Sequence, residues 1–280
     1  MKKFVAVFDG FKMSASTMNY AIQLTKLAHA SLVGVFLDDF IYRNYDSYRV
    51  LVSASNPEAE MKALDAKDKK KRDDAVQLFQ SACGKAGIPF TIHRDKNIAL
   101  QELKHESMFA DLVIISEHET FTHYTEKPPT RFMKDLLGDV QCPVLVVPKK
   151  FKPIDKIVLL YDGKPSSLYA IKMLSYLFGN LNDLPVEVFT VKDTFLSTLR
   201  VPENKLMREF IKRHFPKATY TVVKGNIEEQ VLAHLLDHPE SELVVLGAYR
   251  RNELSRWFKN SMADTLMKEL DTPLFIAHNK

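Results

Sequence analysis

Cysteine is nearly absent from this chain of 280 residues, which contains only Cys83 and Cys142. The two form neither a CxxC pair nor a metal-ligand spacing, which argues against a disulfide framework and against a cysteine-based metal site. No run of about 18 apolar residues occurs, so we expect no transmembrane helix. The first residues, Met1 to Phe4, enter a strand-like pattern directly, without the apolar region of a secretory leader. We therefore expect a reduced, cytoplasmic protein.

A large excess of one charge is lacking as well. The chain has 39 Lys and Arg against 35 Asp and Glu, which gives a net charge of +4. This mild excess does not by itself indicate a nucleic-acid-binding protein. The one dense basic run, Lys67 to Arg72, also contains an acid, and we interpret it as the solvated face of a helix. We therefore expect neither nucleic acid nor membrane among the partners.

Glycine is scarce, with nine copies, and none of them lies between Ile88 and Leu137. No Walker A loop and no GxSxG nucleophile elbow occurs, which argues against a P-loop NTPase and an α/β-hydrolase. A slow ATPase would need a residue that activates water and usually a metal ion, and the sequence offers neither. We therefore predict that the protein is not an enzyme.

An internal repeat organises the chain. Residues 4–10 read FVAVFDG and residues 157–163 read IVLLYDG, and each run leads into serines and a helical pattern. At the other end, residues 142–147 (CPVLVV) match residues 272–277 (TPLFIA). Such self-similarity predicts two copies of one structural unit.

The two copies differ in length. Asp9 and Asp162 are 153 positions apart, whereas Pro143 and Pro273 are 130 apart, so the first copy holds about 23 extra residues. We place most of them in the tyrosine-containing stretch 38–57, which either packs on its own domain or forms a surface for a partner. A basic linker with a proline lies at 149–153, which predicts domains at 1–150 and 151–280.

Short apolar runs alternate with helical patterns in each copy. The first copy has predicted strands near 4–8, 32–37, 88–93, 112–115 and 144–147. The second has them near 157–161, 186–191, 219–223, 243–246 and 274–277. Buried strands separated by helices are typical of a parallel sheet covered on both faces. We predict an α/β fold with two tandem doubly wound domains, each a five-stranded parallel sheet flanked by helices.

Ligands of doubly wound sheets bind at the carboxyl ends of the strands, and two features of the second copy lie there. Asp162-Gly163 follows the first strand, where a carboxylate can hold a ribose hydroxyl or simply form a turn. Gly247 follows the fourth strand, and a glycine allows a close approach of the backbone. Ser261, which begins the last helix, can donate its hydroxyl to a phosphate or cap its own helix.

This spacing resembles that of universal stress proteins. That family closes its domain with a phosphate loop, G-x2-G-x9-G-[ST], followed by a helix and a CPV-like strand. The second copy keeps the spacing with Gly247, Arg250, Asn260 and Ser261, but two of the three glycines are replaced. Asn tolerates a positive φ, so the change at position 260 is mild. Arg250 is the serious departure, because its side chain either binds phosphate or blocks the site.

The resemblance implies the adenine nucleotide alpha hydrolase-like fold and one adenine-nucleotide site at most, for ATP or AMP, in the second copy. Asp162 would hold the ribose and the Val191 backbone the adenine. The phosphates would be bound by Gly247, Arg250, Asn260 and Ser261. The resemblance also implies that residues 144–147 pair with 274–277, which would make the chain an internal pseudo-dimer.

The first copy has lost the phosphate loop. Its fourth strand ends in Ser116-Glu117-His118-Glu119, and these carboxylates would repel a phosphate. We interpret the segment as an exposed loop and do not expect Glu117, His118, Glu119 and His123 to bind a metal. His234 and His238 lie on one helix but lack the glutamate of a metalloprotease motif, so no metal is expected there. The sequence thus leaves two functions open: a stress-response protein with one nucleotide site, or a scaffold that acts only through protein partners.

Overall fold

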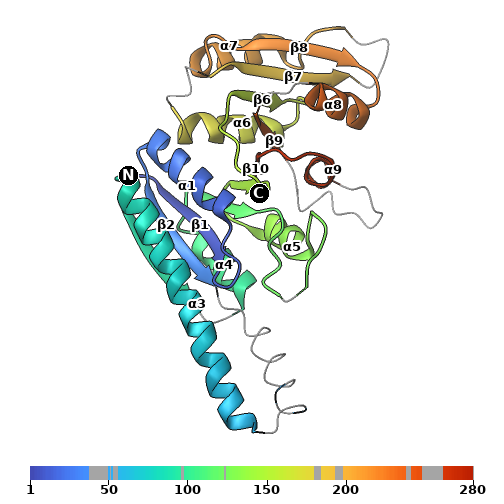
Figure 1. Ribbon diagram of the computed structural model, residues 1–280. Helices are drawn as coiled ribbons and strands as arrows, with labels where there is room; N and C mark the ends of the chain where they lie inside the picture. Colours follow the sequence, from blue (N-terminus) through green and yellow to red (C-terminus); the bar gives the residue numbers. More distant parts are fainter. Residues whose placement is uncertain are drawn as a thin grey trace. The chain divides into compact units, whose positions relative to one another are not determined.

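The computed structural model describes residues 1–37, 50, 52, 56–95, 98–122, 124–179, 184–192, 198–237, 241–247 and 261–279. The chain divides into two compact units, Met1–Gln141 and Cys142–Lys280. Each unit is an α/β structure in which parallel strands are flanked by helices (Figure 1). The predicted fold class is therefore confirmed.

The strands of unit 1 are β1 (Lys3–Asp9), β2 (Ser31–Leu37), β3 (Phe90–Asp95) and β4 (Leu112–Ser116). Their spatial order is β3-β2-β1-β4, and every pairing among them is parallel. The core contains the fully buried Phe8 and Phe79, whose rings meet at 5.6 Å. Gly34 makes room for this cluster, because a Cβ there would lie 2.7 Å from the Phe79 ring.

Unit 2 contains β5 (Val144–Val147), β6 (Lys156–Leu160), β7 (Val186–Lys192), β8 (Thr219–Lys224), β9 (Glu242–Gly247) and β10 (Leu274–Ala277). Their order is β5-β10-β9-β6-β7-β8. The β5–β10 pair is antiparallel, with Leu145 opposite Phe275, and confirms the strand pairing expected from the sequence. Because β5 pairs in this way, it is grouped with unit 2, although it is the last strand of the first sequence copy.

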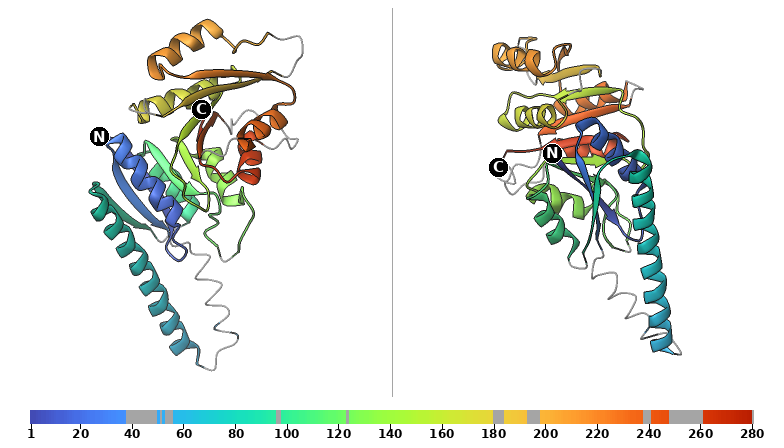
Figure 2. Two further views of the ribbon diagram at one scale, coloured as in Figure 1. Left: turned by 45° about the horizontal axis from the view of Figure 1, so that its top comes forward. Right: turned by 90° about the vertical axis from the view of Figure 1, so that its left-hand side faces the viewer.

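Helices cover both faces of each unit. In unit 1, α1 (Ala15–Ala28) and α3 (Pro57–Ala86) pack together, and α4 (Ala99–Ser107) packs with α5 (Arg131–Asp139). In unit 2, α6 (Pro165–Leu177) and α7 (Asn204–His214) lie on one face, and α8 (Ile227–Leu236) and α9 (Met262–Glu269) lie on the other (Figures 1 and 2).

Local sequence sets the helix ends. Asn226 caps α8, since its side chain accepts hydrogen bonds from the backbone N–H of Glu228 and Glu229. Asn56 precedes Pro57 and caps α3, and Gly87 ends the same helix with a left-handed φ of 66°. These residues explain where α3 begins and ends and where α8 begins.

The extra length of the first copy is carried mainly by a helix. α3 has 30 residues, whereas its counterpart α7 has 11. The assignment of most extra residues to 38–57 is therefore wrong, because the helical pattern continues into a highly charged stretch with little buried surface. The first half of α3 extends past the strands of unit 1 (Figure 2). Most of residues 38–55 lie outside the described residues.

Each unit carries an ionic cluster where its first strand begins. In unit 2, Lys156 Nζ lies 2.9 Å from Glu187 and 3.1 Å from Glu242, and His234 lies 3.1 Å from Glu187. Thr221 donates a further hydrogen bond to Glu187. Burial alone would raise the pKa of Glu187, but the bonds from Thr221 and Lys156 outweigh it and lower the pKa.

The cluster of unit 1 uses the same residue types on different elements. Lys3 Nζ lies 3.1 Å from Glu106, and His93 Nδ1 lies 2.5 Å from the same carboxylate. Here the glutamate is on helix α4 and the histidine on strand β3. In unit 2 the glutamate is on strand β7 and the histidine on helix α8. Both clusters contain Lys, Glu and His, but the helix carries the glutamate in unit 1 and the histidine in unit 2.

Candidate functional site

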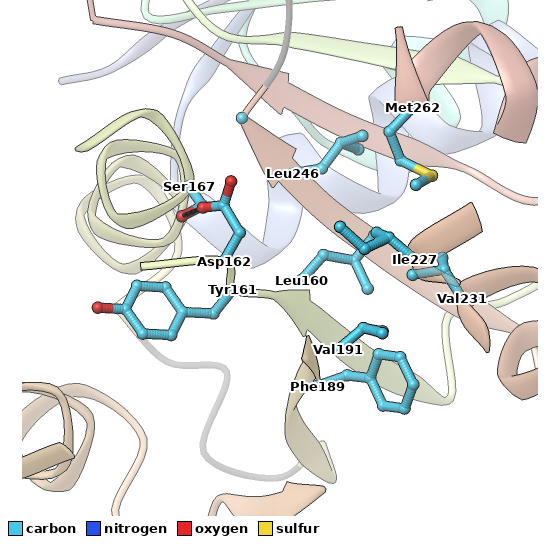
Figure 3. Close-up of a pocket in the computed structure, with 11 residues that line it drawn as sticks. Leu160, Tyr161, Asp162, Ser167, Phe189, Val191, Ile227, Val231, Leu246 and Met262 are labelled. Carbon is cyan, nitrogen blue, oxygen red and sulfur yellow. Dashed lines mark hydrogen bonds between the residues drawn. The ribbon is translucent and has the colours of Figure 1, made fainter. Parts of the chain in front are cut away.

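A pocket of about 120 Å³ lies at the carboxyl ends of the strands in unit 2 (Figure 3). Strands β6, β7 and β9 and helices α6, α8 and α9 contribute its walls. Three of the residues predicted from the sequence, Asp162, Val191 and Gly247, line it together. The remaining lining residues are Leu160, Tyr161, Ser167, Phe189, Ile227, Val231, Leu246 and Met262.

Asp162 combines the two roles that the sequence left open. Its Oδ1 accepts hydrogen bonds from the Lys164 N–H at 2.9 Å and from the Ser167 hydroxyl at 2.6 Å. These bonds make the carboxylate part of the turn that begins α6. Asp162 is nevertheless exposed and lines the pocket, so a ligand can reach the carboxylate. A turn and a ligand contact are compatible at this residue.

Gly163 explains the shape of the same turn. Its φ of 83° lies in the left-handed region, where a side chain is strained. A Cβ at this position would also lie 2.6 Å from Cβ of Pro202. The Asp-Gly pair is therefore required locally by backbone conformation, whatever the carboxylate binds.

Packing requires a glycine at position 247, for a reason that the sequence did not reveal. A Cβ added to it would lie 2.3 Å from the carbonyl carbon of Ser166 and 2.6 Å from the backbone N of Ser167. The first turn of α6 thus packs directly on the end of β9. The close backbone approach expected at this glycine involves helix α6, and contact with a phosphate stays a prediction.

The pocket walls are mostly apolar. Leu160, Ile227 and Met262 turn toward one another, whereas the ring of Tyr161 points away from them (Figure 3). Phe189 lines one side of the pocket, and its ring stacks on the ring of His234 with centroids 4.0 Å apart. Such a lining suits a flat, largely apolar group with a few polar atoms.

The apolar wall was not among the sequence predictions, although the spacing of its residues was visible in the sequence. Leu160 and Asp162 are two positions apart, as are Phe189 and Val191, so each pair points to one face of its strand. Ile227 and Val231 are four apart and share one face of α8. These spacings, taken together, are the signal in the sequence that indicates the apolar wall.

Ser261 begins α9 with extended backbone, and its side chain makes no capping hydrogen bond to the helix. The capping role is therefore not realised, and the hydroxyl is left to other interactions next to Met262, which lines the pocket. Asp264 lies in the first turn of the same helix and places a negative charge there. Arg250 and Asn260, the other two predicted phosphate ligands, lie outside the described residues.

In unit 1, the residues that follow β4 are largely buried. Glu117, Glu119 and Phe121 are 5%, 7% and 1% exposed. The interpretation of this stretch as an exposed loop is therefore wrong for these residues, although His118 is exposed. The polar local sequence did not show this burial. The Phe121 ring lies 4.7 Å from that of Phe132.

Hydrogen bonds hold this segment in place. Thr130 donates to the Glu119 carbonyl at 2.6 Å and accepts from the Met133 N–H, so it caps α5 as well. Lys12 Nζ donates to the Thr122 carbonyl at 3.1 Å. Burial, followed by the nearby charge of Asp9, raises the pKa of Glu119 to about 8. Unit 1 thus places the acidic side chains Glu117 and Glu119 where a phosphate would need hydrogen-bond donors.

Within the described residues, no group of three or more His, Cys, Asp and Glu is arranged to hold a metal ion. No described helix is long and apolar enough to cross a membrane. Cys83 is buried, and burial raises the pKa of its thiol to about 11, so this cysteine is poorly reactive.

Comparisons with known proteins point to one family. A universal stress protein of Synechocystis is 22% identical over 177 residues, which are 62% of this chain and 59% of that protein. The chain thus spans less than two thirds of this curated relative. No family model matches the chain.

Two solved structures share the fold. The crystal structure of a universal stress protein from Archaeoglobus fulgidus has a TM-score of 0.68 at 12% identity, with 99% of this chain and 98% of that chain covered. A protein of unknown function from Pseudomonas aeruginosa has a TM-score of 0.56 at 11% identity, with 99% and 92% covered. The resemblance to universal stress proteins, in a tandem form, is therefore confirmed in sequence and in fold.

Proposed function

We propose that the chain is a non-catalytic stress-response protein with one adenine-nucleotide site, formed by the pocket of unit 2. The observation that carries this proposal is the convergence of Asp162, Val191 and Gly247 on one pocket. All three are residues for which the sequence predicts nucleotide contacts. The stress-response role follows from the similarity to the Synechocystis protein.

The apolar wall suits the adenine ring, and the exposed Asp162 carboxylate can accept hydrogen bonds from the ribose hydroxyls. Ser261 supplies a hydroxyl next to the first turn of α9 for the phosphates. The pocket is smaller than the roughly 300–1,000 Å³ of sites for drug-sized ligands. We infer that it takes the base and that the sugar and phosphates lie toward its rim.

Isothermal titration calorimetry with ATP and AMP tests this function. We expect a stoichiometry of one per chain, because unit 1 presents carboxylates at the corresponding place. Ile227→Trp fills the pocket from α8 and should abolish binding. Ile98→Trp is the matched control, since Ile98 stands at the start of α4 in unit 1 and is 51% exposed, against 48% for Ile227.

A stoichiometry of two, or loss of binding in Ile98→Trp alone, would contradict the assignment to unit 2. Absence of any binding would favour the second candidate, a scaffold that acts through protein partners. The bonds of Asp162 within its turn and the packing of Gly247 on α6 favour that alternative, because both residues already have a structural role. In either case we propose that the two units form an internal pseudo-dimer in the cytoplasm.

A further inference from the structure

Positive charge is concentrated in one described segment of unit 2. Residues 198–224 contain seven basic residues and two acidic ones, an excess of five. The whole chain has a net charge of +4, so the remainder is slightly acidic. The segment comprises α7 and the edge strand β8, with basic residues at Arg200, Lys205, Arg208, Lys212, Arg213, Lys217 and Lys224.

Helix α7 turns most of this charge outward. Met207 and Ile211 are buried against the unit, whereas Lys205, Arg208 and Lys212 are exposed. Arg208 lies over the Tyr220 ring at 4.3 Å and is thereby held at the surface. Among the residues that the structure describes, Lys205 and Lys212 have no ion-pair partner, so their charges are available to a ligand.

Large apolar side chains stand beside these cations. Leu206 on α7 and Tyr176 on α6 are 63% and 53% exposed. His214 connects the two helices, with its ring 4.5 Å from Phe210 and 5.8 Å from Tyr176. We name the residues Leu206, Phe210, His214 and Tyr176 the α6–α7 ridge. Lys172, whose Nζ lies 5.6 Å from the Tyr176 ring centroid, adds a further cation next to it.

We propose that the α6–α7 ridge and the basic residues of α7 dock unit 2 on the surface of an anionic membrane. A helix with an exposed Leu and a half-buried Phe beside Lys and Arg is an arrangement that suits the interface of a bilayer. Clusters of four to eight Lys and Arg attract anionic lipid headgroups, and each residue strengthens binding about fivefold.

Lipid fits the ridge better than nucleic acid does. Leu206 is aliphatic and cannot stack on a base, but it can enter the boundary between headgroups and acyl chains. Leu206 and Tyr176 are exposed, so they suit a deformable surface. The sequence led us to expect no membrane partner because no spanning segment is present, and a surface contact requires none.

Vesicle flotation with the full chain tests the proposal. We expect binding to vesicles of equal parts phosphatidylglycerol and phosphatidylcholine, no binding to phosphatidylcholine alone, and release at high salt. The double variant Lys205→Glu with Lys212→Glu should lower the partition coefficient by at least about 25-fold. Leu206→Ser should lower it as well, because the aliphatic anchor is lost.

Two control variants match these changes elsewhere. Lys69→Glu with Lys70→Glu reverses two exposed charges on α3, and Leu236→Ser removes a leucine that is 64% exposed on α8. Both should bind as the parent does. Failure of the parent to bind anionic vesicles, equal loss in the control variants, or tighter binding to a DNA duplex than to vesicles would each overturn the proposal.

Discussion

Gly247 and Ser166 are in backbone-to-backbone contact: a Cβ on Gly247 would lie 2.4 Å from the Ser166 carbonyl oxygen. The contact joins the end of β9 to the first turn of α6, and the same turn holds the Asp162 carboxylate through Ser167. The geometry of the candidate site therefore depends on a glycine whose own role is packing.

Gly247→Ala should destabilise the protein by about 1–3 kcal/mol, because the added methyl group overpacks against backbone that cannot rotate away. Urea unfolding measures the change. Gly84→Ala is the control: Gly84 lies inside α3, nothing is within 4 Å of its Cβ position, and the change should stabilise by about 0.5–1 kcal/mol. Equal effects of the two variants would contradict the packing.

Glu119→Gln should change how stability depends on pH. The folded pKa of Glu119 is about 8, above its ordinary value, so the folded state holds a proton that the unfolded state has released. The parent therefore loses stability from this group as pH rises from about 4.5 to about 8. The stability of the variant lacks this decrease with pH, so the variant should be more stable than the parent at alkaline pH.

Urea unfolding across this pH range gives the comparison, and Glu60→Gln on the exposed part of α3 is the control. The control should follow the parent at every pH. If Glu119→Gln runs parallel to the parent as well, Glu119 is ionised in the folded protein at neutral pH.

Lys156→Met should destabilise by about 3–5 kcal/mol, because it leaves the buried Glu187 and Glu242 without their shared cation. Lys3→Met removes the corresponding cation of unit 1. Its side chain is 28% exposed, against 12% for Lys156, so the cost should be near 1 kcal/mol. Guanidinium unfolding of both variants tests the order, and a larger loss for Lys3→Met would contradict it.

Arg250→Gly together with Asn260→Gly restores the phosphate-loop glycines of universal stress proteins and should tighten ATP binding. Glycine lets the backbone approach the phosphates, and the change removes a side chain that narrows the space for them. Calorimetry with ATP measures the gain. If the parent already binds in the low micromolar range and Arg250→Gly alone weakens binding, Arg250 is a phosphate ligand.

The repeat, the strands and the β5–β10 pairing could be predicted because each depends on short apolar runs. The runs 144–147 and 274–277 are fully apolar and close the two copies, so pairing satisfies both strand edges. The start of α8 was equally clear, since Asn226 precedes a helical pattern and is a favoured cap.

Other features depend on contacts that no local pattern encodes. Glu119 lies in a polar stretch that was predicted to be exposed. The hydroxyl of Thr130, eleven positions later, donates a hydrogen bond to its backbone carbonyl and holds the segment in place. Gly247 was predicted to contact a ligand, whereas the structure packs it against the backbone of Ser166, 81 positions away. Such distant partners decide burial, and the sequence does not show them.

The burial of the residues that follow β4, Glu117, Glu119 and Phe121, has a thermodynamic consequence for unit 1. Phe121 and Glu119 are already buried there, so the ligand-free first unit has its loop in contact with its own side chains. A ligand stabilises a protein only through sites that it occupies in the folded state. Under the function proposed above, occupancy and folding would be linked in unit 2 alone, and a saturating nucleotide would raise the unfolding temperature of that unit.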